Sequence, residues 1–180
     1  IDFLFSDYNI NEQTANNIAF VGYMNHYPNE DAILYFYNQI FNLIKKELAD
    51  IKLYIIGSFP TKKVLALTKD KNIAVTGFVE DIRPYLRNCS LLIVPVRLGG
   101  GVRMKILEAM AMGIPVISTS VGCNGIDFTE GKDIIIADRP EEFAKQVVRL
   151  LQDENLRRSL SKNGRRLIEE KYGIKRTASQ

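Results

Sequence analysis

The sequence predicts an α/β protein: a doubly wound, Rossmann-like parallel sheet of about six strands with helices on both faces. Short runs rich in isoleucine and valine, apolar throughout rather than alternating with polar residues, are typical of parallel strands buried on both sides. These runs alternate with segments whose apolar residues recur every three or four positions, as on one face of a helix. At 180 residues, the chain is long enough for one such core and short for two.

The strands are predicted from apolar runs that glycine, proline or polar residues interrupt. The first run, IAFVGY, contains Gly22 near its end. The predicted strands are residues 18–23, 52–57, 73–78, 90–96, 115–120 and 133–138. Ligands bind such sheets at the carboxyl ends of the strands, near the point where the strand order reverses. We therefore expect a site in the loops after strands one, three, four and five.

The helices are predicted from start and stop signals around the periodic segments. Pro28 opens the first helix and Pro60 the second, because proline fits the first turn of a helix. Asp81 is expected to cap a third helix, and Gly113 to end a fourth. The predicted helices are residues 29–48, 60–68, 81–88, 102–112, 140–152 and 154–172.

Composition narrows the class of protein. With 46% hydrophobic and 25% charged residues, the chain reads as a folded domain. A net charge of +3 without any Lys/Arg block is too mild to predict a nucleic-acid partner. Cys89 and Cys123 are far apart and His26 is the one histidine, so neither a zinc site nor a disulfide framework is predicted. A reducing cytoplasm is the expected location.

The first residues differ from the rest. Residues 1–17 are polar and irregular, so we expect a linker or a remnant of an upstream domain, and residues 18–180 are expected to form the folded domain. Ile1 is not a natural start residue, which indicates a piece of a larger protein. No apolar run reaches the roughly 18 residues that a membrane span requires.

Several familiar site motifs are absent from the sequence. The turn after the first strand, GYMNHYPNED, has one glycine and not the G-x-G-x-x-G of dinucleotide-binding proteins. The Walker A pattern, a D-x-D carboxylate pair and the G-x-S-x-G serine motif are also missing. We therefore expect no bound cofactor and no metal site.

The turn at residues 99–101 poses a conflict that an anion resolves. Three glycines lead into a predicted helix whose first turn carries Arg103 and Lys105. Each cation there opposes the helix dipole by about 0.3–1 kcal/mol, and the free amides of the turn need an acceptor. A diphosphate bound at this end satisfies the amides and the cations together, and glycines let it approach. The alternative is that both cations simply extend into water.

Glu108 lies three residues after Lys105 and therefore on the same side of that helix. A carboxylate accepts hydrogen bonds from both hydroxyls of a ribose, so Glu108 is a candidate for the sugar of a nucleotide. The alternative is a surface ion pair with Lys105.

The segment GGGVRMKILEAMAMGIPVIS resembles the donor-binding signature of group 1 glycosyltransferases, the retaining, nucleotide-sugar-dependent enzymes of family 4. VGYMNHYPNEDAILYF, GFVEDIRPYLRNCSLLIVPV and the C-terminal GKDIIIADRPEEFAKQVVRLLQDENLRRSLSKNGRRLIEEKYG are similar to further segments of the same family. The resemblance spans residues 18–176 and implies one half of a GT-B fold, the C-terminal, donor-binding domain. The acceptor-binding N-terminal domain is then expected upstream of this chain.

The resemblance also implies site residues. Arg103, Lys105 and Glu108 are expected to carry catalysis, the two cations at the diphosphate and the glutamate at the ribose. The base and the phosphates are expected to be met by Gly22, Asn25, His26, Gly77, Phe78, Val79, Arg97, Gly100, Gly101 and Val102. Many family members have a glutamate eight positions before the second one, but Gly100 stands there in this chain. Arg97 is expected to help replace the cations usually found after the first strands.

The implied activity is metal-independent transfer of a hexosyl group from a nucleotide diphosphate sugar to an acceptor hydroxyl, with retention, in cell-envelope polysaccharide synthesis. The isolated domain is expected to be inactive, and the full protein to touch a membrane where its acceptor is a lipid. The alternatives are a nucleotide-sugar epimerase or a phosphorylase of the same architecture, or a non-enzymatic nucleotide-binding module. A receiver-like module requires acidic residues where Gly22 and Gly77 stand.

Overall fold

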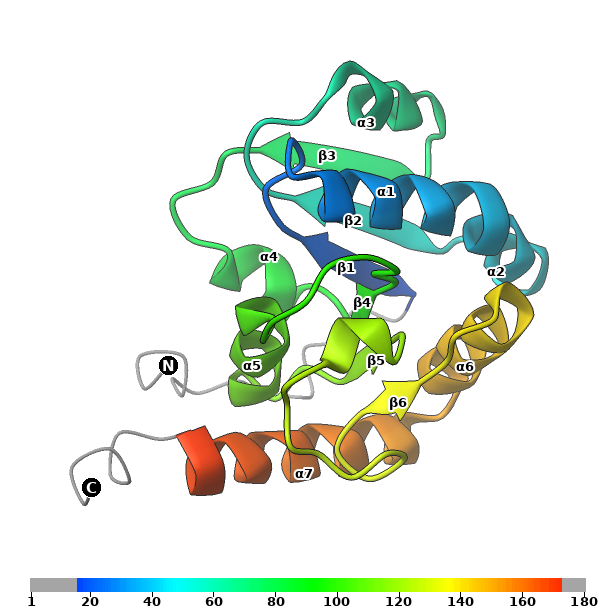
Figure 1. Ribbon diagram of the computed structural model, residues 1–180. Helices are drawn as coiled ribbons and strands as arrows, with labels where there is room; N and C mark the ends of the chain where they lie inside the picture. Colours follow the sequence, from blue (N-terminus) through cyan, green and yellow to red (C-terminus); the bar gives the residue numbers. More distant parts are fainter. Residues whose placement is uncertain (1–15, 173–180) are drawn as a thin grey trace.

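Within residues 16–172, which this computed structural model describes, six parallel strands form one sheet in the order β3-β2-β1-β4-β5-β6 (Figure 1). The strands are β1 (Asn17–Val21), β2 (Lys52–Ile56), β3 (Ile73–Gly77), β4 (Leu91–Val94), β5 (Val116–Ser118) and β6 (Ile135–Ile136). The order reverses between β1 and β4, so the predicted doubly wound sheet is confirmed. Residues 1–15 of the expected linker lie outside the described residues, and Asn17 already belongs to β1.

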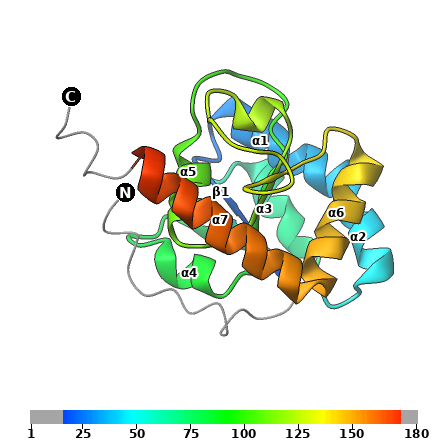
Figure 2. The same cartoon turned by 90° about the horizontal axis from the view of Figure 1, so that it is seen from below.

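The helices form two groups on opposite faces of the sheet, as right-handed crossovers require. They are α1 (Tyr27–Tyr35), α2 (Asn42–Glu47), α3 (Lys62–Ala66), α4 (Arg83–Arg87), α5 (Met104–Ala111), α6 (Pro140–Gln152) and α7 (Glu154–Tyr172), with short η3 (Phe36–Phe41), η4 (Leu67–Lys69) and η5 (Val121–Cys123) segments. In one group α1 packs against α3 and α2 against α6, and in the other α5 packs against α7 (Figure 2). All four residues of β4, in the middle of the sheet, are buried.

The first predicted helix, residues 29–48, is not a uniform α-helix. It begins at Tyr27 and is interrupted by the π-helical segment η3. In η3 the rings of Phe36 and Phe41 are buried, and Phe36 meets Phe143 of α6 edge-on with ring centroids 6.0 Å apart. Apolar residues three or four apart predict a helix but do not distinguish its winding, because that depends on these tertiary contacts.

Three boundaries differ from expectation for local reasons. Helix α3 starts after Thr61, whose hydroxyl accepts a hydrogen bond from the Val64 amide, so Pro60 precedes the cap rather than opening the helix. Asp81 accepts a hydrogen bond from the Arg83 amide but lies one residue before the α4 N-cap. The last predicted strand shortens to two residues because it pairs with β5 alone at the sheet edge.

The stop at Gly113 is confirmed. This glycine has a φ of 72°, its amide bonds to the Met110 carbonyl, and the Ile114 amide bonds to the Ala109 carbonyl. This pair of bonds is a Schellman motif, which satisfies the last carbonyls of a helix. It ends α5 directly before β5.

Gly57, at the end of β2, is a position where we expect a large loss of stability on substitution. It has a φ of 141°, and a Cβ atom there would overlap the carbonyl oxygen of Gly22 at the end of β1. We expect Gly57→Ala to lower the free energy of unfolding by about 3 kcal/mol or more, from strain and overlap together. Chemical denaturation measures this.

Gly131→Ala is the matched control, because Gly131 also has a positive φ (76°) but open space around its Cβ position. Strain alone predicts a loss of about 1–2 kcal/mol there. Equal losses for the two variants would contradict the close approach of β1 and β2.

Candidate functional site

A cavity of about 390 Å³ opens at the carboxyl ends of β1, β2 and β3, whose arrowheads point to the same side in Figure 1. It spans the reversal in strand order, since α5, which follows β4, forms one wall. It is lined by Val21, Gly22, Tyr23, Asn29, Gly57, Ser58, Phe78, Val79, Ile82, Met104, Lys105 and Glu108. Five predicted site residues therefore meet here: Gly22, Phe78, Val79, Lys105 and Glu108.

Lys105 places an uncompensated positive charge in this cavity. It is the second residue of α5, and its ammonium donates a hydrogen bond to the side-chain oxygen of Asn29 at 2.8 Å and lies 4.8 Å from the centre of the Phe20 ring. Burial, with the positive charge of Arg103 added, lowers the pKa of Lys105 from 10.5 to about 8. Among the described residues, no carboxylate forms an ion pair with it. Such an ammonium gains from an incoming anion.

Glu108 lies one turn further along α5, on the same wall. The alternative ion pair with Lys105 is not formed, because Lys105 bonds to Asn29 instead. No described residue donates a hydrogen bond to the Glu108 carboxylate, and burial raises its pKa. The carboxylate is therefore available to hydroxyl groups of a ligand.

The glycine turn before α5 and the first turn of this helix carry backbone amides without a hydrogen-bond acceptor in the described residues. Gly99 and Gly101 adopt positive φ angles of 91° and 84°. No described residue accepts a hydrogen bond from the backbone amides of residues 100–105, a range that includes Gly100 and Val102. These donors lie at the positive end of α5, so the turn can bind an anion.

Arg103 supports this turn rather than extending free into the cavity. Its guanidinium donates to the carbonyls of Gly101, Leu98 and Gly99 at 3.0–3.2 Å. Arg103 was predicted to bind the diphosphate, but in the structure its N–H groups donate to carbonyls of its own loop. It is the N-cap residue of α5, and its three bonds hold together the loop that carries the free amides.

The remaining predicted contacts lie at the rim or beyond it. Asn25 and His26 are exposed in the β1–α1 loop, and the His26 carbonyl accepts hydrogen bonds from the amides of Asn29 and Glu30 in the first turn of α1. Gly77, the last residue of β3, has a φ of 71° and directs the chain toward Phe78. None of these three lines the cavity.

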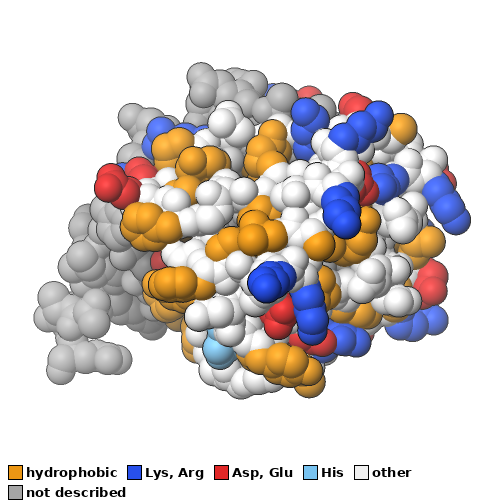
Figure 3. Space-filling view, turned by 90° about the horizontal axis from the view of Figure 1, so that it is seen from above, with side chains coloured by type: hydrophobic (Ala, Val, Ile, Leu, Met, Phe, Trp, Pro, Cys, Tyr) orange, Lys and Arg blue, Asp and Glu red, His pale blue; other side chains and the backbone are white. Residues whose placement is uncertain are grey.

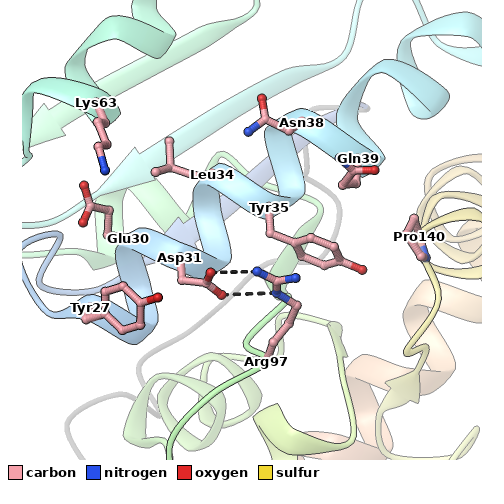
Figure 4. A pocket seen from close by; sticks show the side chains of 10 residues that line it. All are labelled: Tyr27, Glu30, Asp31, Leu34, Tyr35, Asn38, Gln39, Lys63, Arg97 and Pro140. Carbon is pink, nitrogen blue, oxygen red and sulfur yellow. Dashed lines mark hydrogen bonds and ion pairs between the residues drawn. The ribbon is translucent and has the colours of Figure 1, made fainter.

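Arg97 lies in a different place from the one expected. It forms an ion pair with Asp31 of α1 (2.7 Å) and stacks over the Tyr35 ring, with 4.1 Å to its centre. These residues line a second, larger cavity of about 540 Å³ between α1, α3 and the start of α6 (Figure 4). Because Asp31 already compensates Arg97, this arginine does not supply the missing charge near Lys105.

Two contributors to the first cavity, Asn29 and the loop after β2, were not among the predicted site residues. Asn29 was read only as a helix start, and its contact with Lys105 joins residues 76 positions apart. Gly57 and Ser58 follow strand two, a loop that was not expected to contribute. The aromatic rim was also missed in part: Tyr23 and Phe78 are 65% and 74% exposed. Exposed hydrophobic patches lie among basic side chains on the face shown in Figure 3.

Two features are absent from the part of the chain that the structure describes. No helix in residues 16–172 is long and apolar enough to cross a membrane. In the same range, no group of three or more His, Cys, Asp or Glu side chains is arranged to hold a metal ion.

The sequence matches known proteins over most of its length. The capsular polysaccharide biosynthesis glycosyltransferase CapM of Staphylococcus aureus is 29% identical over 143 residues, which cover 74% of this chain and 37% of CapM. The chain spans less than half the length of the curated relatives it matches.

Solved structures share the fold. S. aureus TarM, crystallised with UDP, alpha-GlcNAc-glycerol and Fondaparinux, aligns with a TM-score of 0.79 and 18% identity over 93% of this chain and 34% of TarM. The C-terminal domain of the group 1 family protein LpcC from Francisella tularensis aligns with a TM-score of 0.72 and 21% identity, over 93% of this chain and 91% of that domain. The fold is therefore that of a glycosyltransferase C-terminal domain.

The family model for "Glycosyl transferases group 1" matches residues 15–153, which contain both the cavity and the glycine turn. The chain therefore belongs to the group 1 glycosyl transferases.

Proposed function

We propose that this domain binds the nucleoside diphosphate of a sugar donor, and that the full protein transfers the sugar to an acceptor hydroxyl with retention at the anomeric carbon and without a metal ion. The observation that supports this most is Lys105, an uncompensated cation that lines the cavity from the first turn of α5, the helix that the free amides of residues 100–105 lead into. UDP in TarM supports a nucleoside diphosphate as the ligand class.

The chemistry follows from where charge develops. When the bond between the sugar and the diphosphate breaks, negative charge grows on the departing phosphate oxygens. Lys105 and the α5 amides are fixed beside that position in the proposed pose, so they stabilise the transition state more than the bound substrate. This is the role that a metal ion plays in other transferases. If it is correct, a chelator leaves the activity of the full enzyme unchanged.

The rest of the nucleotide fits the other walls. Glu108 accepts hydrogen bonds from the two ribose hydroxyls, and Phe78 and Val79 contact the base. Gly100 stands where many family members have a first glutamate that contacts the donor sugar. Other groups must therefore contact the sugar in this protein. The identity of the sugar, which we propose to be a hexose, is then set elsewhere in the full protein.

The proposed enzyme requires a second domain. An acceptor-binding N-terminal domain would supply the acceptor, so we expect this chain alone to bind nucleotide weakly and to turn over no sugar. The likeness to CapM supports a role in polysaccharide synthesis at the cell envelope. We propose a cytoplasmic enzyme that meets the membrane only when its acceptor is a lipid.

Isothermal titration of this chain with UDP, GDP, ADP and CMP tests the proposal. We expect one of the three diphosphates to bind at least about tenfold more tightly than CMP, because the second phosphate adds charge-assisted hydrogen bonds of about 1.5–3 kcal/mol. Glu80→Gln, at an exposed carboxyl in the β3–α4 loop, is expected to bind like the wild type. Equal affinity for CMP and all three diphosphates would contradict a diphosphate site.

A further inference from the structure

We propose that Asn29 is a positioning residue for the donor phosphates: its side-chain oxygen holds the Lys105 ammonium at the end of β1 without neutralising it, so the positive charge stays available to the ligand. The inference rests on the proposed function. It adds a residue from the β1–α1 side of the fold to a site otherwise built on α5.

Both polar atoms of the Asn29 side-chain amide form hydrogen bonds. Its oxygen accepts from the Lys105 ammonium at 2.8 Å, and its nitrogen donates to the Tyr23 carbonyl at 3.0 Å. Because a carbonyl can only accept hydrogen bonds, the Tyr23 carbonyl must face the side-chain nitrogen of Asn29, and the side-chain oxygen therefore faces the lysine. The β1–α1 loop, through Asn29, therefore determines the position of the Lys105 ammonium.

The surroundings of Lys105 hold the charge without compensating it. Its ammonium faces the Phe20 ring and Asn29, both of which are neutral. The charged groups that act on it are Arg103, which disfavours the ammonium form, and Glu108, which favours it from a distance too long for an ion pair. Lys45 shows the contrasting arrangement, since the Asp70 carboxylate lies 2.5 Å from its ammonium and compensates its charge.

The end of β1 is shaped around the pair. A Cβ atom at Gly22 would lie 2.7 Å from the Asn29 side-chain nitrogen and 2.9 Å from the Lys105 ammonium, both too close. A larger residue at this position would push the two polar groups aside, so glycine leaves them room where they cross the strand end. The β1–α1 stretch, through Gly22 and Asn29, and the start of α5, through Lys105, therefore fit together in one geometry.

The test replaces the neutral acceptor with a charged one of the same shape. Asn29→Asp is expected to pair with Lys105, raise its pKa, and weaken UDP binding at pH 7 by about tenfold or more. The pKa is followed in the ligand-free chain from the Lys105 side-chain NMR signals over pH 6–11, and affinity by isothermal titration. If GDP or ADP is the diphosphate that binds the wild type, it replaces UDP.

The control is Asn38→Asp, which adds the same charge at an exposed asparagine further along the same helical stretch. It is expected to leave both the Lys105 pKa and the affinity at wild-type values. Asn29→Asp with wild-type affinity, whether or not the Lys105 pKa rises, overturns the inference, and so does an equal loss in Asn38→Asp. A wild-type chain that binds no diphosphate overturns the proposed function itself, a separate result read before any variant is made.

Discussion

Lys105→Met is expected to make the ligand-free protein more stable and, in the same molecule, to remove donor binding. Holding the ammonium charged where its pKa falls from 10.5 to about 8 costs the fold about 3 kcal/mol at neutral pH. Methionine removes that penalty and leaves the Asn29 oxygen without its partner, a loss of about 1–2 kcal/mol. We expect a net gain of about 1–2 kcal/mol, and diphosphate binding at least about 100-fold weaker.

The stability difference between the Lys105→Met variant and the wild type is expected to depend on pH. Between about pH 8 and pH 10.5 the unfolded chain holds a proton on Lys105 that the folded chain has released, so the wild-type free energy of unfolding gains with rising pH there relative to the variant. The advantage of Lys105→Met is therefore full below about pH 8 and disappears toward pH 10.5. Urea denaturation of both proteins at several pH values measures the difference.

Lys63→Met is the control, because Lys63 is exposed and lines the other cavity. It is expected to change neither stability nor diphosphate binding beyond about 0.5 kcal/mol. A destabilised Lys105→Met protein that still binds the diphosphate with wild-type affinity would make Lys105 a structural residue and remove it from the site.

Glu108→Gln is expected to abolish discrimination between ribose and deoxyribose. The wild type should bind UDP at least about tenfold more tightly than dUDP, because a hydrogen bond to a charged group contributes about 1.5–3 kcal/mol. Glutamine offers one acceptor instead of two and no charge, so the variant should bind the two nucleotides about equally. Burial raises the pKa of Glu108, so removing its charge is not expected to destabilise the fold.

The comparison of two ligands on two proteins isolates the contact. A general loss of affinity from disturbed packing lowers UDP and dUDP binding together and leaves their ratio at the wild-type value. That outcome would place the ribose away from Glu108. If the base proves to be guanine or adenine, the matching deoxynucleotide pair is used.

The doubly wound parallel sheet and most of its helices and strands could be predicted, because continuous Ile/Val runs and helical periodicity can be read locally in the sequence. The helix over residues 154–172 and the stop at Gly113 came out as expected. The π-helical segment could not be predicted, since it depends on Phe36 meeting Phe143 across the fold. The starts of α3 and α4 were missed by one or two residues because Thr61 and Ile82 take the N-cap positions.

The site could be predicted where it lies on one helix and not where distant segments meet. Lys105 and Glu108 share the cavity, as their spacing on α5 indicated. Arg97 and Arg103 were predicted to lie at the diphosphate because of their number and position, but each has a partner, Asp31 or the loop carbonyls, that only the folded chain reveals. The contact of Asn29 with Lys105 could not be predicted for the same reason, since the two residues are far apart in the sequence. A count of charges along a sequence does not show which of them are already compensated.

A crystal structure of this chain with the tightest-binding nucleoside diphosphate tests the central claim most directly. We predict phosphate oxygens within hydrogen-bond distance of the Lys105 ammonium and of amides in residues 100–105, with the ribose hydroxyls on Glu108. Phosphates found instead in the cavity of Arg97 and Asp31, with the start of α5 left free, would contradict the account.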